Sequence, residues 1–309
     1  MAGPFLVVDN LHKRYGRTPA LDGVSFRVAE GELFGLLGPN GAGKSTLIAI
    51  LSCLLPATSG RATLLGEELS PANAAVRRLI GIVPQDLAIY PDLTARENLA
   101  FFGRLYGLGG SDLAKRVDEV LETVALSDRA DDRVATYSGG MKRRLNFGAA
   151  LVHRPRVLYL DEPTVGVDPQ SRNHIFEGVR RLNAAGATVI YTSHYMEEVQ
   201  ALCTRVGILD HGRLVACDAL PNLLRTLDAV IRFRAPDPPP DLRERLGGLP
   251  AKLHVADGVF ELHTPDVQPV LVRLLAVLNG LNVTATDLGV REANLERVFL
   301  HLTGRDLRD

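Results

Sequence analysis

The stretch of sequence that decides the fold is Gly38-Pro39-Asn40-Gly41-Ala42-Gly43-Lys44-Ser45-Thr46. It fits the pattern G-x-x-x-x-G-K-S/T, and it joins a short apolar run at 33–37 to a helix-like run at 45–55. Glycines let backbone amides and the helix N-terminus face a polyphosphate, while Lys44 neutralises the terminal phosphates and Ser45 ligates magnesium. The stretch therefore predicts a loop that binds nucleotide phosphates together with Mg²⁺.

Two acidic residues end a second apolar run, at 157–160. Asp161 and Glu162 follow that run directly, and paired acids at the end of a buried strand are costly. Beside a phosphate-binding loop, Asp161 can hold the magnesium shell and Glu162 can orient or deprotonate the attacking water. The alternative, a solvated turn before Pro163, loses weight once the loop is present.

Short apolar runs alternate with helix-like stretches through the first 220 residues, which is typical of an α/β fold with a parallel sheet. Runs at 5–8, 24–28 and 61–65 alternate apolar and polar residues, as half-exposed antiparallel strands do. Between Ala95 and Leu126 the spacing becomes helical, with Ser111 as the expected cap. We therefore expect a P-loop core with an antiparallel β subdomain and a helical insertion at about 86–150. The buried strands that we expect are 33–37, 80–83, 157–160, 187–191 and 205–209.

A proline-rich stretch at 235–240 marks a loop or linker, because proline lacks the amide donor and fixes its backbone angle. Around it lie strand-like runs at 230–233, 252–255, 259–263 and 282–286, and helix-like runs at 267–278 and 294–302. This order predicts a small α+β domain with a split βαβ arrangement. The expected domains are 1–227 and 228–309.

Composition narrows the choice of partners. The 35 basic and 36 acidic side chains nearly cancel, so there is no electrostatic footprint for nucleic acid and we expect no such partner. The apolar runs are shorter than the roughly 18 residues that span a bilayer, and residues 1–10 do not resemble a secretory signal. We expect a cytoplasmic protein whose membrane contact is local or mediated by another protein.

Further segments then follow in the order found in the ATPase subunits of ABC transporters, and the chain resembles that family over about residues 5–220. Tyr137-Ser138-Gly139-Gly140-Met141-Lys142 resembles the family signature. This resemblance implies that Ser138, Gly139 and Gly140 bind the γ-phosphate held by the opposite subunit. The commoner signature begins with leucine and has glutamine in place of Met141, and an isolated Ser-Gly-Gly string is usually only a loop.

The resemblance assigns roles to four more residues. Tyr15 stands where the family's aromatic residue stacks on adenine, and Gln85 where its glutamine meets magnesium and the attacking water. Asp168 matches the acid of the loop that crosses the dimer interface, and His194 the histidine that contacts the γ-phosphate. Outside this context, Gln85 is more often a surface residue, His194 a structural one and Asp168 a helix cap.

The resemblance also implies an assembly that binds ATP and Mg²⁺. Because the signature completes the site of the other protomer, two chains are needed, either two copies or a related partner subunit. ATP should close this dimer and hydrolysis should open it. Residues 86–108 occupy the region where the family receives a membrane permease, although their aromatic rings are explained equally well as the insertion's own core.

Finer resemblance concerns segments 137–145 and 294–300, which look like those of ABC-2 type exporters. This group includes daunorubicin-resistance ATPases, polysaccharide or nodulation-factor export ATPases, and lipid exporters. Those proteins often carry an acid before a valine-phenylalanine pair, where this chain has Arg297. The expected function is ATP-driven export through a separate ABC-2 type permease. The alternatives are an importer ATPase, a non-transport ABC protein, and an unrelated P-loop kinase or GTPase.

Overall fold

The computed structural model describes residues 5–304 of the 309-residue chain. Residues 1–4 and 305–309 lie outside the described residues, and with them the ends of the two expected domains and part of the segment 1–10. The described chain divides into two compact units, residues 5–220 and 221–304. Within it, no helix combines the length and apolar character needed to cross a membrane.

A six-stranded sheet forms the centre of the first unit. Its strands are β3 (Leu33–Leu37), β6 (Ile80–Val83), β7 (Val157–Asp161), β8 (Thr188–Ser193), β9 (Arg205–Asp210) and β10 (Arg213–Ala219). Their order across the sheet is β10-β9-β3-β8-β7-β6, with every pairing parallel except that of β9 with β10. All five residues of β3 and of β7 are buried, which explains their continuous apolar sequences. The predicted α/β class is confirmed.

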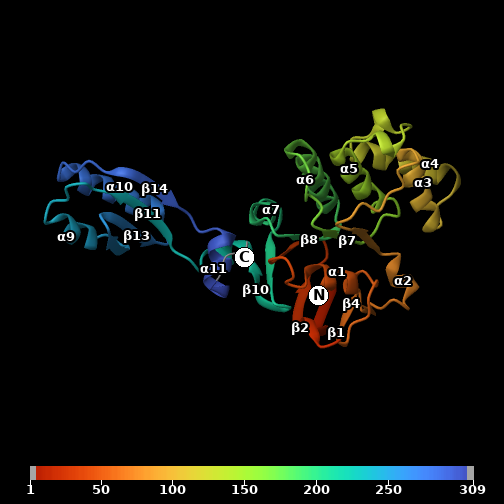
Figure 1. Ribbon diagram of the computed structural model, residues 1–309, viewed down its shortest axis with the longest axis horizontal. Helices are drawn as coiled ribbons and strands as arrows, with labels where there is room; N and C mark the ends of the chain where they lie inside the picture. Colours follow the sequence, from red (N-terminus) through yellow and green to blue (C-terminus); the bar gives the residue numbers. More distant parts are fainter. Residues whose placement is uncertain (1–4, 305–309) are drawn as a thin grey trace. The chain divides into compact units, whose positions relative to one another are not determined.

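An antiparallel sheet covers one face of this core (Figure 1). It contains β1 (Leu6–Tyr15), β2 (Thr18–Val28), β4 (Ser59–Leu64) and β5 (Glu67–Glu68), in the order β2-β1-β4-β5. Phe26 stacks on Phe34 of β3 with ring centroids 5.2 Å apart, and α1 (Lys44–Leu51) buries Leu47 and Ile48 in the same core. These contacts fix α1, and therefore the loop before it, against the ends of the central strands.

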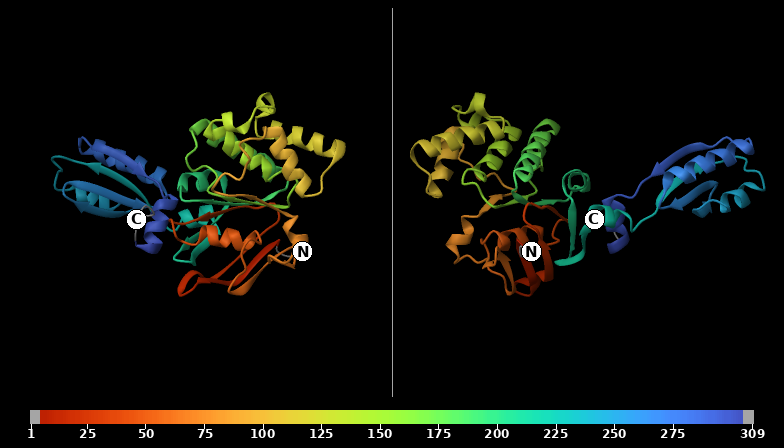
Figure 2. Two further views of the ribbon diagram at one scale, coloured as in Figure 1. Left: turned by 45° about the vertical axis from the view of Figure 1, so that its right-hand side comes forward. Right: turned by 180° about the vertical axis from the view of Figure 1, so that it is seen from behind.

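The remaining helices of the first unit lie on the other side of the central sheet, apart from the short α2 (Figure 2). They are α3 (Ala95–Leu105), α4 (Gly110–Thr123), α5 (Gly139–Ala149), α6 (Pro169–Ala184) and α7 (Met196–Leu202); α2 spans Ala74–Arg77, and 3₁₀ turns span Ser127–Arg129 and Val134–Thr136. The expected cap at Ser111 is wrong. Helix α4 begins at Gly110 with Gly109 as its N-cap, so Ser111 already lies in the first turn. Gly109 has an extended backbone, and no side chain forms a capping hydrogen bond at the start of α4.

The second unit is an antiparallel sheet packed on helices. Its elements are α8 (Leu220–Leu224, at the division), β11 (Ala229–Arg234), α9 (Leu242–Gly247), β12 (Lys252–Ala256), β13 (Val259–Thr264), α10 (Val267–Gly280), β14 (Thr286–Arg291) and α11 (Leu295–Thr303). The strand order β12-β13-β11-β14 and the element order βαββαβ give a split βαβ arrangement. Phe233 and Phe260 stack at 5.1 Å between ring centroids within its core.

One strand of the second unit differs from the expectation. The fourth strand is β14 at 286–291, whereas the run 282–286 is mostly a loop. Asn282 has a left-handed backbone with φ of +51°, which directs the chain away from α10 instead of extending it. All six residues of β14 are exposed, so this edge strand lacks the apolar pattern that would have revealed it.

Candidate nucleotide site

The phosphate-binding loop joins the end of β3 to the start of α1. Gly41 and Gly43 have left-handed backbones, with φ of +79° and +106°. A Cβ atom on Gly38 would lie 2.3 Å from the backbone oxygen of Leu209, and one on Gly43 would lie 2.5 Å from that of Ala20. The loop therefore curls in a conformation, and in a space, that only glycine permits at these positions. Pro39, Asn40 and Ala42 complete the loop, and Ser45 and Thr46 lie in the first turn of α1.

Lys44 is buried beside the loop, with 4% of its surface exposed. Its Nζ donates to the backbone oxygens of Gly38 at 2.7 Å and Pro39 at 3.0 Å, and it lies 3.1 Å from Oε1 of Glu162. A buried ammonium is costly unless oxygen atoms satisfy its donors. These three oxygens do so, and they keep a positive charge next to the glycine-rich backbone.

The two acids lie where β7 ends. Asp161 accepts a hydrogen bond from Thr192 Oγ1 at 2.9 Å. Its burial raises the pKa of its carboxyl group, and the Ser45 side chain acts in the opposite direction. Glu162 turns away from the strand with φ of +46°, and its backbone N donates to Thr192 Oγ1 at 3.0 Å. Thr192, which lies opposite Asp161 on β8, thus orders both acids and was not anticipated from the sequence.

Glu162 is the point at which three of the expected residues meet. The residue is 5% exposed, and its Oε2 lies 3.1 Å from Nδ1 of His194, which follows β8. The same oxygen accepts from Nε2 of Gln85, just beyond β6, at 3.5 Å. Lys44 approaches the other carboxylate oxygen. A carboxylate held between a lysine, a histidine and an amide can bind a water molecule and accept its proton.

The donor set suits a magnesium ion that is shared with phosphates. Mg²⁺ prefers oxygen ligands, takes few of them from the protein and keeps phosphate oxygens and waters as the others. The Ser45 side chain is near enough to the Asp161 carboxylate to oppose the rise that burial causes in its pKa, and the Gln85 amide lies beside Glu162, the next residue. Over residues 5–304, no group of three or more His, Cys, Asp or Glu side chains could hold a metal by itself. The residues therefore fit a metal that binds together with a nucleotide.

Ser138, Gly139, Gly140 and Asp168 form a second cluster, at the N-termini of α5 and α6. Ser138 caps α5 by accepting from the backbone N of Met141 at 3.2 Å. Asp168 caps α6, and a Cβ atom on Gly140 would lie 2.7 Å from its Oδ2. Gly139 instead has open space where a side chain would stand. Within the described chain, Ser138 makes its hydrogen bond inside α5 and contributes none to the Glu162 cluster.

Two residues on α5 that the sequence reasoning missed connect these clusters. Arg143 donates to the backbone oxygen of Gln85 and, at 3.3 Å, to that of Val165 in the turn after Glu162. Asn146 is 2% exposed and accepts from the backbone N of Ala88 at 3.0 Å. A signal was present, because two polar residues three positions apart share one face of a helix.

The remaining expected residues lie nearer the surface. Tyr15 ends β1 with 51% of its surface exposed, and Lys13 Nζ lies 5.4 Å from its ring centroid. In the region 86–108, the rings of Tyr90, Phe101 and Phe102 pack on one another, with centroids 5.0 to 6.3 Å apart. Tyr90 nevertheless remains 47% exposed, so these rings serve the insertion's packing and still leave a surface.

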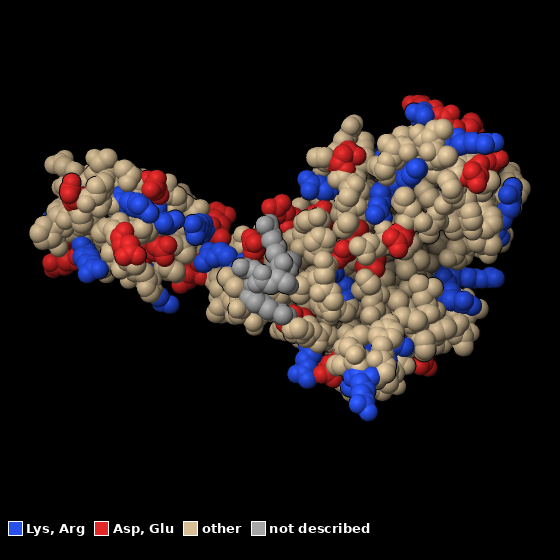
Figure 3. Space-filling model, viewed as in Figure 1, with Lys and Arg blue, Asp and Glu red and all other residues tan. Residues whose placement is uncertain are grey.

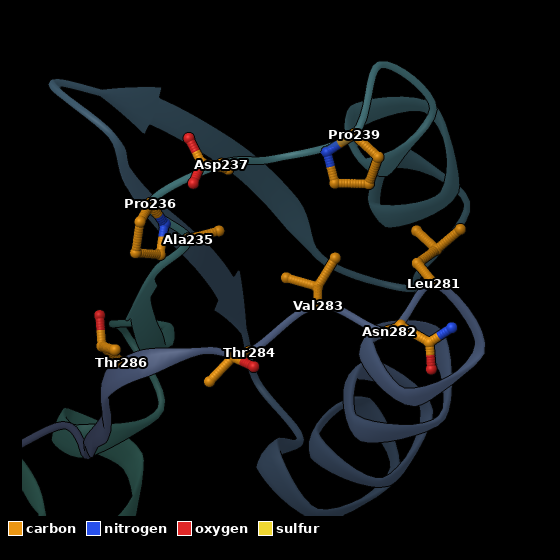
Figure 4. A pocket seen from close by; sticks show the side chains of 9 residues that line it. All are labelled: Ala235, Pro236, Asp237, Pro239, Leu281, Asn282, Val283, Thr284 and Thr286. Atoms are coloured by element: carbon orange, nitrogen blue, oxygen red, sulfur yellow. The ribbon is translucent and has the colours of Figure 1, made fainter.

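The second unit contains a pocket of about 370 Å³ with a different character (Figure 4). It is lined by Ala235, Pro236, Asp237, Pro239, Leu281, Asn282, Val283, Thr284 and Thr286. Its charged side chain is acidic, so this lining does not attract phosphate. Elsewhere on the visible face, basic and acidic side chains are interspersed (Figure 3). The first unit differs from this pocket because a buried lysine and two buried acids, Lys44, Asp161 and Glu162, lie close together there.

Comparison with known proteins agrees with this geometry. Residues 21–165 match the ABC transporter family. The linearmycin resistance ATP-binding protein LnrL of Bacillus subtilis is 48% identical, over 98% of this chain and all of its own length. The Nod factor export ATP-binding protein I of Paraburkholderia xenovorans is 42% identical over 97% of both chains. The ATP-binding cassette MJ0796, solved as a dimer with ADP and Pi, has a TM-score of 0.64 and 27% identity, covering 70% of this chain and 98% of its own. The chain belongs to the ATP-hydrolysing, ATP-binding subunits of ABC transporters.

Proposed function

We propose that the chain hydrolyses ATP to power the export of a substrate through a separate ABC-2 type membrane permease. The observation that carries the hydrolytic part is the buried Glu162, with Lys44 and His194 each 3.1 Å from its carboxylate. Two of the relatives are named for resistance to linearmycin and for export of Nod factor, which supports the export part of the proposal.

In the proposed reaction, the residues of one chain divide the work. Lys44 exchanges carbonyl and carboxylate partners for phosphate oxygens, and the glycine-rich backbone supplies further donors. Glu162 accepts the proton of the attacking water, and His194 and Gln85 hold the carboxylate and the water in place. A magnesium ion, when bound by Ser45, Asp161 and the phosphates, neutralises charge on the phosphoryl group. Tyr15 offers its exposed ring to adenine.

A second chain completes the site. The open space at Gly139 and the helix N-terminus capped by Ser138 suit a phosphate oxygen presented by another copy or a related subunit. Asp168, exposed at the start of α6 beside Gly140, lies next to this surface. ATP then favours the closed dimer, and loss of the γ-phosphate removes the contact. The dimeric cassette MJ0796 supports this arrangement.

The permease contact is proposed for residues 86–108, at the cytoplasmic face of the membrane. Arg143 and Asn146 join α5 to residues 85–88, so a change at the signature helix can move this surface. The exposed faces of Leu87, Tyr90 and Leu105 provide apolar area for a partner helix.

Co-purification tests this function. We would purify tagged Glu162→Gln protein with ATP from detergent-solubilised native membranes and identify its partners. A permease of about six predicted helices without a solute-binding protein is expected. Recovery of a solute-binding protein would indicate an importer, and recovery of only ribosomal or soluble partners would indicate a non-transport ABC protein.

A further inference from the structure

Glu198 is a buried carboxylate that has no role in the proposed reaction. It lies on α7 with 3% of its surface exposed. Its carboxylate accepts from Thr164 Oγ1 at 2.8 Å to both oxygens, from the Tyr191 hydroxyl at 2.9 Å and from Ser193 Oγ at 3.0 Å. These partners are hydroxyl groups and not cations. A buried charge held in this way has a desolvation cost that a neutral side chain would avoid.

The three hydroxyl groups are well suited to donate to one acceptor. Burial raises the pKa of Tyr191, and the charge of Glu198 raises it further, so the phenol stays protonated. Ser193 also accepts from the backbone N of Tyr195 at 2.9 Å, which leaves its own proton for Glu198. The carboxylate therefore joins groups from three segments: the turn after β7, the end of β8 and α7.

The position of these groups relates Glu198 to the catalytic acids. Side chains alternate along a strand, so Tyr191 and Ser193 face Glu198, whereas Thr192 between them contacts Asp161 and Glu162. His194 follows Ser193 and reaches Glu162. On the other segment, Thr164 lies two residues after Glu162 in the same turn, whose backbone closes from Val165 N to Glu162 O at 3.3 Å.

We propose that Glu198 is a positioning residue that holds the turn carrying Glu162 and the segment carrying His194 in register for hydrolysis. This inference rests on the proposed roles of Glu162 and His194. One acceptor that receives hydrogen bonds from both segments fixes them relative to each other, which separate hydrogen bonds within each segment cannot do. The desolvation cost of the charge is thus balanced by preorganisation of the site.

The test compares Glu198→Gln with Glu197→Gln in the full-length chain. Glu197 is the exposed neighbour on the same helix turn, so it is a matched control. The amide introduced by Glu198→Gln presents a donor where hydroxyl groups already donate, so the two segments should loosen. We expect kcat to fall about tenfold while KM for ATP changes less than about twofold. Hydrogen exchange should become faster in peptides 160–168 and 188–202, which cover the three joined segments, and remain unchanged elsewhere.

Turnover and exchange in Glu198→Gln equal to those in Glu197→Gln would overturn the proposal. Faster exchange throughout the first unit, with a lower melting temperature, would also overturn it and make Glu198 a general stability residue. Thr164→Val then gives an independent check, because it removes one hydroxyl group at nearly constant volume. The fold losses of Thr164→Val and Glu198→Gln should not multiply in the double variant. If Glu162→Gln proves active, the proposed role of Glu162 fails, whereas local hydrogen exchange still reports whether Glu198 holds the two segments together.

Discussion

The two units of this chain treat buried polar groups in opposite ways. Residues 5–220 contain charged side chains with less than a tenth of their surface exposed. They are Lys44 at the start of α1, Asp161 and Glu162 where β7 ends, and Glu198 on α7. In residues 221–304, Thr264 is the buried polar side chain that the structure describes. The core of this unit is otherwise apolar, with residues such as Phe233 and Leu262.

This difference shows two kinds of energetic demand on one chain. Burying charge stabilises nothing by itself, because desolvation offsets much of the attraction between partners. The first unit therefore carries an energetic cost that is explained by phosphate chemistry, whereas the second unit is built for a stable apolar core. Substitutions at buried charges should change catalysis, and substitutions in the apolar core should change stability.

The largest effect is expected for Glu162→Gln. Loss of the proton acceptor should lower turnover by about 10³-fold while ATP still binds, because the amide keeps the shape of the side chain but not its basicity. Phosphate release and equilibrium binding of labelled ATP measure the two quantities. The exposed Glu177→Gln on α6 is the control. Ordinary turnover would remove Glu162 from its proposed role.

Lys44→Ala should weaken nucleotide binding itself. The substitution removes the buried ammonium that faces the phosphates and leaves Glu162 with one fewer partner. We expect ATP affinity to fall about 10- to 100-fold, as loss of a charged hydrogen bond predicts. Titration calorimetry checks this, with the exposed Lys115→Ala as control. Equal affinity in both variants would contradict the phosphate-loop assignment.

Asp161→Asn should raise the stability of the nucleotide-free protein. Burial raises the pKa of Asp161 above its ordinary value of 3.8, so its ionisation opposes folding. The wild type should therefore lose stability relative to Asp161→Asn as pH rises from about 4 to 7, because the asparagine has no proton to lose. Melting temperatures measured across this range provide the test. A wild type that gains on the variant with rising pH would reverse the sign and contradict the account.

The smallest effect on turnover is expected for Phe233→Ala. The side chain is fully buried and stacked on Phe260, so its removal should lower the free energy of unfolding of the second unit by about 3–5 kcal/mol. ATP turnover should stay within about twofold, because the catalytic groups lie in residues 5–220. Val272→Ala, at a position 64% exposed, is the matched control. If turnover fell together with stability, catalysis in the first unit would depend on the core of the second unit, contrary to the prediction.

Sequence patterns predicted the helices and strands that are determined by their own residues. The runs 33–37 and 80–83 match β3 and β6 to the residue, because continuous apolar strands buried on both faces are bounded by turn residues. β14 and the cap of α4 were mispredicted. At Gly109 the backbone conformation sets the start of the helix instead of a polar side chain, and β14 is defined by pairing with β11 and not by its own pattern.

For the site, sequence motifs predicted candidate residues but did not predict the hydrogen bonds that join those residues to distant segments. The phosphate loop and the two acids were predicted because their residue types follow strand ends, and His194 was predicted because it matches a position of the family that the chain resembles. Thr192, Arg143 and Glu198 were missed, since their roles depend on which side of a strand or helix faces a distant segment. Such contacts arise from tertiary packing, and a single sequence carries only weak signals of them.

Mixing two inactive variants tests most directly whether the site is shared between chains. Glu162→Gln lacks the proposed base, and Ser138→Arg places a bulky cation where the second chain would meet phosphate. A heterodimer of the two contains one intact site, formed by Glu162 of one copy and Ser138 of the other. The account predicts that the mixture regains a substantial fraction of wild-type phosphate release, whereas neither variant does so alone. A mixture that is no more active than its separate components would contradict a site completed by a second chain.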